Sequence, residues 1–216
     1  MPILHGVSAS PFVRKTRVAL AEKRVSYDLE PVMPFAVGDD FKKISPLGKI
    51  PVWQDGDFSL PDSSCIIAYL ERVVPDPPLY PEDPKHLGRS LFYEEYADTK
   101  LVESIGPIFI QRFVNKRVFK QEPDEALVSR QLEEGLPPVL DYLDAEVGAG
   151  EDEGIVGGRF SVADIAIAAV MVGLEYAEVG VDARRWPQLA AYLRRVWARP
   201  SFATLLEEEK AALASM

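Results

Sequence analysis

Residues 48–64, GKIPVWQDGDFSLPDSS, decide how the N-terminal part of the chain folds. Within this stretch, two short runs rich in apolar residues, 51–54 and 57–60, flank the pair Asp55-Gly56. An Asp-Gly pair between two such runs is a strong signal for a β-hairpin. A helical spacing of apolar residues follows over residues 63–74. We therefore predict a unit of strand, turn, strand and helix.

The residues before this unit add a strand, a helix and a second strand. Residues 3–7 and 26–32 have strand-like patterns, and the second run alternates apolar and polar residues. Residues 11–23 have a helical pattern, and Pro11 suits the first turn of a helix. The predicted order is therefore β-α-β, an irregular stretch, and then β-β-α.

A proline-rich segment separates this region from a helical one. Residues 75–84, PDPPLYPEDP, contain five prolines, which remove backbone donors and stop helices. After this stiff linker, helical patterns dominate, with a Gly- and acid-rich loop at residues 148–158. The predicted helices cover residues 87–113, 123–147, 162–176, 187–198 and 202–214. We assign residues 1–76 to an N-terminal domain, residues 77–84 to the linker and residues 85–216 to a helical domain.

Composition excludes several classes of protein. The 216 residues carry a formal net charge of −10, and an acidic surface repels phosphate backbones and anionic lipids. We therefore expect no nucleic-acid and no membrane partner, and no apolar run approaches the roughly 20 residues that span a bilayer. The single cysteine, Cys65, cannot form an internal disulfide, and His5 and His86 belong to no cluster with metal-ligand spacing. With no signal-peptide pattern at the first residues, we expect a cytoplasmic protein without a structural metal.

The run Ser8-Ala9-Ser10-Pro11-Phe12 joins the first predicted strand to the first predicted helix. Free backbone N–H groups and the positive dipole end favour an anion at a helix N-terminus. A serine hydroxyl at that place can donate a hydrogen bond to a thiolate. Serine is also a common N-cap, so both interpretations of Ser10 remain open on this segment alone.

Two further segments suit the binding of a peptide-like ligand. Pro51 opens a strand that should be paired, which is unusual. A cis Ile50–Pro51 bond would turn the Ile50 backbone toward a ligand, which could then pair with this backbone as an added strand does. The alternative is that Pro51 is an ordinary proline of an edge strand. Asp62 and Ser63 stand at the start of the next predicted helix. They either cap this helix or bind the zwitterionic end of a ligand, in which case Ser63 would bind its carboxylate and Asp62 its ammonium group.

A fourth segment, Phe160 to Ile165, opens a strongly apolar helix. Ser161 and Asp164 in it have the spacing of a capping box, with Asp in place of the usual Glu or Gln. We interpret this segment as a folding element and assign it no catalytic role.

In their order and spacing, these segments resemble the cytosolic glutathione transferase family along essentially the whole chain. Residues 10–20 resemble the start of tau-class enzymes, which have a catalytic serine there, and of omega-class enzymes, which have cysteine in place of Ser10. Residues 49–52 are similar to the cis-proline segment, residues 62–63 to the acid–serine pair, and residues 160–165 to the capping box of a core helix. The resemblance implies an α/β plus all-α fold, with a thioredoxin-like N-terminal domain followed by an all-helical C-terminal domain.

The resemblance also implies site residues. Ser10 would stabilise the thiolate of glutathione, the co-substrate, and no metal would be required. The residues that would bind glutathione are Phe12, Lys42, Lys49, Ile50, Pro51, Asp62 and Ser63. Within this set, the Ile50 backbone would pair with the cysteinyl part, and Lys49 and Lys42 would face the glycine carboxylate. The electrophile would lie between the domains near Phe12, Phe35, Phe109 and Phe113, although the two residues on the helix suit a plain core equally well.

The implied activity is attack of the activated thiol on an electrophilic carbon or on a peroxide. A free thiol has a pKa of about 8.5, so only a few per cent is ionised at neutral pH. The implied enzyme is thus a glutathione transferase of detoxification, and a homodimer is implied with it. The third helix and the helix after the linker would meet at the dimer interface, where the acidic residues Glu94, Glu95 and Asp98 suggest a partly polar contact.

The sequence departs from the family pattern at two points, and two other functions compete with the transferase. Asp62 is shorter than the family's usual glutamate, and Ser8 competes with Ser10 as the active hydroxyl. One rival is a non-catalytic binding module of the same family, although it would not need the set of Ser10, Pro51, Asp62 and Ser63. The other is a glutathione-dependent isomerase of zeta type, which has a Ser-Ser-Cys segment at the first helix, and Ser8-Ala9-Ser10-Pro11-Phe12 departs from that segment.

Overall fold

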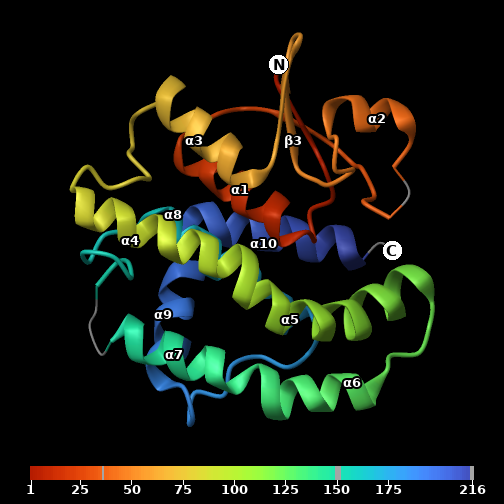
Figure 1. The fold of residues 1–216 in the computed structure, drawn as a ribbon, viewed down its shortest axis with the longest axis vertical. Coiled ribbons are helices and arrows are strands. Elements are labelled where there is room, and N and C mark those ends of the chain that lie inside the picture. Colours follow the sequence, from red (N-terminus) through yellow and green to blue (C-terminus); the bar gives the residue numbers. More distant parts are fainter. Residues whose placement is uncertain (36, 149–151, 215–216) are drawn as a thin grey trace.

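The computed structural model describes residues 1–35, 37–148 and 152–214. It has a small sheet with its helices and a larger helical part (Figure 1). The sheet has four strands in the order β2-β1-β3-β4; β1 is parallel to β2 and antiparallel to β3, which forms a hairpin with β4. The strands are β1 Ile3–His5, β2 Asp28–Glu30, β3 Val52–Asp55 and β4 Phe58–Pro61. This is the thioredoxin-like arrangement that the resemblance implied.

Three helices accompany the sheet: α1 Pro11–Glu22, α2 Asp39–Ile44 and α3 Ser63–Val73. The helices α1 and α3 pack on the sheet through a small apolar cluster of Leu4, Val13, Leu20, Ile50, Trp53, Ile66 and Leu70. The predicted hairpin and both of these helices are confirmed. The helix α2 was not predicted, because it has only six residues, none of them buried, and its two apolar residues are too few to show a helical period.

Ten helical segments, joined by loops, follow in the described part of the chain: α4 Pro84–Tyr96, η1 Ala97–Leu101, α5 Val102–Phe109, η2 Ile110–Phe119, α6 Glu125–Arg130, η3 Gln131–Gly135, α7 Pro137–Val147, α8 Val162–Tyr176, α9 Pro187–Trp197 and α10 Pro200–Ala214. The segments η1, η2 and η3 are π-helical. The first four segments follow one another without a break, so the helix predicted over residues 87–113 begins earlier and ends later. The predicted loop at residues 148–158 includes residues 149–151, which lie outside the described residues.

The helix α8 forms the centre of the helical part. Every residue from Val162 to Leu174 is buried, so this helix has no polar face. Its start is held by Asp164, whose carboxylate accepts hydrogen bonds from Ser161 N at 2.8 Å, Ile155 N at 2.8 Å and Tyr192 Oη at 2.7 Å. Burial raises the pKa of Asp164 above its ordinary value, and these donors oppose the rise. The predicted folding role of this segment is confirmed.

The helix α1 joins the two parts of the molecule. All residues from Val13 to Leu20 are buried, because the sheet lies on one side of the helix and α8 and α10 on the other (Figure 1). Its charged residues therefore need partners inside the protein. Arg14 pairs with Glu209 at 2.8 Å, and Arg17 pairs with Glu208 at 2.7 Å, both on α10. Within the described ranges, no helix combines the length and the apolar character that a membrane span needs.

Candidate functional site

The predicted site segments meet at one end of the sheet. His5 of β1 pairs with Val52 of β3, so the turn that follows β1 lies beside Pro51. A Cβ atom at Gly6 would lie 3.4 Å from the Cβ atom of Ile50, so the backbone of this turn comes close to that residue. Asp62 N lies 3.3 Å from the carbonyl oxygen of Pro51. The turn before α1, the Ile50–Pro51 bond and the start of α3 are therefore neighbours.

Ser10 occupies the N-cap position of α1, and Pro11 stands at the start of the helix. Ser10 N donates to Val7 O at 3.0 Å, which fixes the backbone of the turn. The Ser10 side chain makes no capping hydrogen bond, and its hydroxyl has no partner among the described residues. The position is that of a cap, but the hydroxyl does not cap and is available to a ligand.

The Ile50–Pro51 peptide bond is cis, as predicted. Ile50 is buried in the small cluster, so its side chain is held in the protein. Just before it, Ser45 Oγ donates to Lys49 O at 2.7 Å and accepts from Lys49 N at 3.1 Å. These bonds fix the loop that leads into the cis bond. The predicted pairing of the Ile50 backbone with a ligand stays a prediction.

At the start of α3, Asp62 acts as the N-cap. Its Oδ1 atom accepts from Ser64 N at 2.9 Å and from Cys65 N at 3.1 Å, so the capping interpretation is confirmed. Ser63 is 2% exposed, yet its hydroxyl has no hydrogen-bond partner among the described residues. Cys65 is a poor candidate for a thiolate nucleophile, because burial, and next Asp62, raise the pKa of its thiol. The binding roles of Asp62 and Ser63 toward a ligand remain predictions.

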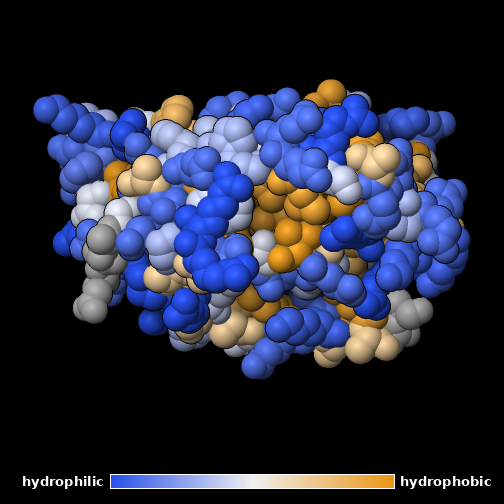
Figure 2. All heavy atoms as spheres, turned by 90° about the horizontal axis from the view of Figure 1, so that it is seen from below, coloured by the Kyte–Doolittle hydropathy of each residue, from blue (hydrophilic) through white to orange (hydrophobic). Residues whose placement is uncertain are grey.

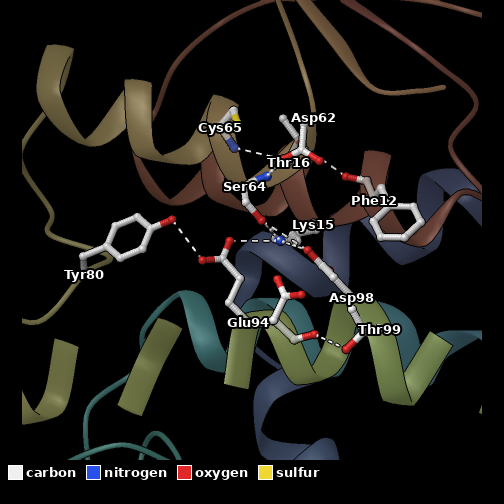
Figure 3. Close-up of polar contacts among 11 residues, drawn as sticks. Phe12, Lys15, Thr16, Asp62, Ser64, Cys65, Tyr80, Glu94, Asp98 and Thr99 are labelled. Carbon is white, nitrogen blue, oxygen red and sulfur yellow. Dashed lines mark hydrogen bonds and ion pairs between the residues drawn. The ribbon is translucent and has the colours of Figure 1, made fainter. Parts of the chain in front are cut away.

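A buried ion cluster lies directly beneath the start of α3 (Figure 3). Lys15 Nζ lies 2.8 Å from Ser64 Oγ, 2.6 Å from Asp98 Oδ2 and 2.9 Å from Glu94 Oε1. Ser64 Oγ donates to Asp98 Oδ2 at 3.1 Å, and Tyr80 Oη donates to Glu94 Oε2 at 3.2 Å. One lysine thus serves two carboxylates that come from the long helix after the linker.

Burial raises the pKa of Asp98, Lys15 opposes that rise, and Glu94 adds to it. This cluster corrects one prediction, because Glu94 and Asp98 point toward α1 of the same chain rather than toward a partner subunit (Figure 3). Glu95, between them, is exposed. The role of Lys15 was missed, since nothing local in the sequence shows that this lysine is buried.

The two predicted lysines lie on the surface. Lys42 of α2 is 3.2 Å from Asp39, an exposed pair of the kind that contributes little to stability. Lys49 is exposed, and its side chain has no hydrogen-bond or ion-pair partner among the described residues. Within the described chain, Lys42 is held only by this exposed pair and Lys49 by none, so neither is prevented from meeting a carboxylate.

The four predicted aromatic residues do not form a single pocket. Phe35 is exposed and contacts Phe119 edge-to-face, with ring centroids 5.4 Å apart. Phe109 and Phe113 are stacked at 5.0 Å, and the Phe113 ring stacks in turn on Tyr176 at 5.3 Å. Phe12 is half-buried in the first turn of α1. The structure therefore brings Phe109 and Phe113 together but places Phe35 in a different contact.

The arrangement suits an anionic sulfur at the start of α1. An unpaired hydroxyl and the N-terminal end of a helix would both favour a negative charge there. The neighbouring Ile50–Pro51 and Asp62–Ser63 segments offer backbone groups and a free hydroxyl to the rest of a peptide. In the part of the chain that is described, no group of three or more His, Cys, Asp or Glu residues is placed to hold a metal ion.

Comparison with known proteins covers both parts of the chain. Residues 4–78 match the family model of the glutathione S-transferase N-terminal domain, and residues 109–209 match that of the glutathione S-transferase C-terminal domain. A glutathione S-transferase of Triticum aestivum is 29% identical over 211 residues, which are 97% of this chain and 94% of that protein.

A stringent starvation protein A homolog of Haemophilus ducreyi is 29% identical over 196 residues, which are 88% of this chain and 83% of that protein. Among solved structures, a glutathione S-transferase of Methylobacterium radiotolerans in complex with glutathione sulfonate is 32% identical. Its TM-score is 0.73, and the match covers 94% of this chain and 93% of that one.

Proposed function

Because the chain belongs to the glutathione S-transferase family, we propose that it activates the thiol of glutathione for attack on an electrophile. The observation that carries this proposal is the Ser10 hydroxyl, which stands at the start of α1 without a hydrogen-bond partner among the described residues. A hydroxyl engaged in capping would have to give up that bond to serve a ligand. Ser10 has no such bond to lose.

Stabilising the thiolate is the chemical task of Ser10. Lowering the pKa of a thiol by two units makes most of it anionic at neutral pH, which corresponds to about 2.7 kcal/mol. A charge-assisted hydrogen bond contributes about 1.5–3 kcal/mol. One hydroxyl together with the end of a helix dipole is therefore sufficient for this task.

The neighbouring segments would hold the rest of the tripeptide. The Ile50 backbone pairs with the cysteinyl part, as an added strand would. Asp62 and Ser63 hold the γ-glutamyl end, and the unpartnered hydroxyl of buried Ser63 supports this assignment. Lys49 and Lys42 face the glycine carboxylate. Each of these groups orients the sulfur toward Ser10 and leaves the reaction itself to the thiolate.

The reaction with an aryl halide balances without any further reagent. The thiol proton passes to solvent, a carbon–sulfur bond forms, and the halide leaves with the electrons of the broken bond. With a hydroperoxide, the thiolate attacks the terminal oxygen, the O–O bond breaks and an alcohol leaves, which gives the sulfenic acid of glutathione. A second glutathione then displaces water from that sulfur, and glutathione disulfide is the product. The proposed contacts of the electrophile are Phe12 and the stacked pair Phe109 and Phe113. Phe35 contacts Phe119 instead, so it would meet only an electrophile that reaches that pair.

A second candidate is a binding module of the same family without catalysis. The similarity to a stringent starvation protein A homolog, which is not named as a transferase, supports this second candidate. Retention on immobilised glutathione, followed by an assay with 1-chloro-2,4-dinitrobenzene, separates the two. Retention with turnover supports the transferase, retention without turnover supports the module, and loss of both contradicts the proposed glutathione site.

We also propose a cytoplasmic homodimer. Apolar side chains are exposed on the two helices that the resemblance places at the interface, with Val73 of α3 at 52% and Leu91 and Phe92 of α4 at 46% and 45%. Burying such side chains against a second copy removes them from water. Sedimentation at micromolar concentration tests this, and a species of monomer mass alone would contradict it.

A further inference from the structure

Arg14 of α1 lies inside the protein although it carries a full charge. In the view of Figure 2, hydrophilic side chains cover most of the surface, which is where charged groups are expected. The Arg14 side chain is only 1% exposed, and that of its partner, Glu209 of α10, is 0% exposed. Because moving two charges out of water costs free energy, such a pair adds little stability compared with apolar side chains of the same size. This favours a role for the pair other than stability.

The guanidinium group of Arg14 joins three parts of the chain. It donates from Nε and Nη2 to Glu209 Oε2, at 3.0 and 2.8 Å, and from Nη1 to Ala169 O of α8 at 2.8 Å. Its Nη2 atom also donates to Ala9 O, at 3.4 Å. Ala9 stands between the two serines that compete as the active hydroxyl. The guanidinium therefore holds the backbone of the turn that carries both of them.

Glu209 is itself held in place by a residue of α8. Tyr176 Oη donates to Glu209 Oε2, and the Arg14 guanidinium carbon lies 5.2 Å from the centre of the Tyr176 ring. That ring stacks on Phe113, with the ring centroids 5.3 Å apart. The planar fork of an arginine makes several hydrogen bonds only in one orientation. The carboxylate and the ring thus fix the direction in which the fork meets the turn.

The turn that carries Ser10 depends on restraints of this kind. The Ser10 side chain makes no capping hydrogen bond, so it does not fasten its own residue to the helix start. Within the turn, Ser10 N donates to Val7 O at 3.0 Å, and the Arg14 contact restrains the neighbouring carbonyl of Ala9. Hydrogen bonds weaken steeply when donor and acceptor lose their alignment. A hydroxyl that has to meet a sulfur atom therefore needs a fixed backbone beneath it.

A second arginine of the same helix offers an internal comparison. Arg17 Nη2 pairs with Glu208 Oε2 at 2.7 Å, and Arg17 Nε donates to Tyr27 Oη at 2.7 Å. Glu208 precedes Glu209 on α10, so both arginines link the same two helices. Among the described residues, no hydrogen bond runs from the Arg17 side chain to residues 8–10. Arg17 thus shares the structural task of Arg14 without its contact to the turn.

We propose that Arg14, oriented by Glu209, is a positioning residue that fixes the turn carrying Ser10 and so sets how closely the hydroxyl meets the thiolate. This inference rests on the proposed function, because it adds a residue to the same site. Arg14 acts through the Ala9 carbonyl and does not touch the sulfur. Loss of the restraint should raise the pKa of the bound thiol and leave glutathione in place, since the other proposed contacts are unchanged.

The first test compares Arg14→Lys with Arg17→Lys in conjugation with 1-chloro-2,4-dinitrobenzene as a function of pH. Lysine keeps a cation beside Glu209 but loses the fork that also reaches Ala9. We expect Arg14→Lys to raise the pKa of the bound thiol by at least about 0.5, which lowers the rate about threefold on the acid side of the profile. At high pH the rates should converge, because the thiol is then ionised in both proteins. The KM for glutathione should change less than about twofold.

The control Arg17→Lys should keep the wild-type profile. A purely structural role of Arg14 would lower the rate by the same factor at every pH, because only the amount of folded enzyme would change. An Arg14→Lys profile with the wild-type pKa would therefore overturn the proposal.

A double variant separates positioning from stability and serves if Arg14→Lys fails to fold. Arg14→Met with Glu209→Leu removes the restraint on Ala9 together with the buried carboxylate, and apolar side chains can replace a buried pair. Circular dichroism should show a folded protein, yet the pKa of the bound thiol should rise as in Arg14→Lys. A folded double variant with the wild-type pH profile would refute the positioning role.

Amide hydrogen exchange separates this inference from the proposed function. It is followed by mass spectrometry on the protein without glutathione, in a peptide that includes residues 8–10. Exchange there should be at least about threefold faster in Arg14→Lys than in Arg17→Lys, because the turn opens more often. If the wild type shows no conjugation while this difference is found, the proposed function fails and the restraint by Arg14 stands. Equal exchange in the two variants would contradict the restraint, whatever the activity.

Discussion

The ammonium nitrogen of Lys15 lies 2.6 Å from a carboxylate oxygen of Asp98 and joins the sheet part of the molecule to its helical part. The Lys15 side chain is 1% exposed and that of Asp98 17%, so the pair lies largely out of water. Buried charges of this kind are tolerated only while each retains its partner. Because Glu94 shares the same lysine, the loss of Lys15 would leave two carboxylates without their cation.

Replacing Lys15 by Met should therefore destabilise the protein strongly. We expect the free energy of unfolding to fall by about 3–5 kcal/mol, the usual cost of removing one partner from a buried ion pair. Urea unfolding followed by circular dichroism measures this. The matched control is Lys43→Met, which breaks an exposed pair with Asp40 and should cost less than about 1 kcal/mol. Equal effects of the two changes would contradict the buried role of Lys15.

The loss of stability caused by Lys15→Met should shrink as the pH falls below neutrality. Burial raises the pKa of Asp98 and Lys15 opposes this, so removing the lysine raises that pKa further. A carboxyl with a raised pKa in the folded state holds its proton more tightly there than in the unfolded state. Its protonation therefore favours folding at low pH, and this contribution is lost as the pH rises through the folded pKa. A loss that stays constant as the pH falls would show that Asp98 does not titrate in this way.

Replacing Ser10 by Ala should slow conjugation while leaving glutathione bound. Loss of one charge-assisted hydrogen bond of about 1.5–3 kcal/mol corresponds to a rate roughly ten- to a hundredfold lower near neutral pH. The apparent pKa of the bound thiol should rise, and the affinity for glutathione should change less, since the other contacts remain. The test is the conjugation rate with one aryl halide as a function of pH, measured for the wild type, Ser10→Ala and Ser8→Ala. If Ser8→Ala loses activity and Ser10→Ala does not, Ser8 is the active hydroxyl.

Replacing Ser10 by Cys should change the kind of reaction. A thiol at a helix N-terminus has a lowered pKa and is a nucleophile in its own right. It can form a mixed disulfide with glutathione, so conjugation should fall and thiol–disulfide exchange should appear. Mass spectrometry after incubation with glutathione disulfide detects the adduct. A variant that forms no adduct and keeps normal conjugation would contradict the position of Ser10 beside the sulfur.

The Arg14–Glu209 pair offers a test by double substitution. Arg14→Met alone should cost about 3–5 kcal/mol, because it leaves a buried carboxylate without its cation. Adding Glu209→Leu removes that carboxylate and should restore a large part of the loss, since two apolar side chains can replace a buried pair. Urea unfolding of the single and double variants measures the coupling. A double variant less stable than Arg14→Met would contradict this account.

Local signals explain which parts of the fold could be predicted. Asp55-Gly56 marks its hairpin, and Ser161 with Asp164 marks the start of α8, because turn and cap chemistry lie within a few residues. The helix α2 carries only a weak signal, with acidic Asp39 and Asp40 in its first turn and basic Lys42 and Lys43 in its last. It has six residues and buries none of them, so it is too short to show an apolar period.

Long-range partners explain what could not be predicted. Lys15 and Asp98 are 83 residues apart, and Arg14 and Glu209 are 195 residues apart, so no local pattern connects them. A charged residue without a visible partner is assigned to the surface, which is why Glu94 and Asp98 were expected at a subunit contact. The motif segments around Ser10, Pro51 and Asp62 were found because each is short and lies at a turn or a helix start.

The burial of α1 on all sides has a consequence for how the molecule melts. The proline-rich linker marks a change in sequence pattern, but a chain cut there would expose the face of α1 that packs on α8 and α10. It would also leave Arg14, Lys15 and Arg17 without their carboxylates. We therefore expect the two halves to unfold together. Calorimetric heating should show one cooperative endotherm, with a van't Hoff enthalpy equal to the calorimetric one. We thus expect the proline-rich linker to mark a boundary in the sequence but none in the unfolding of the protein.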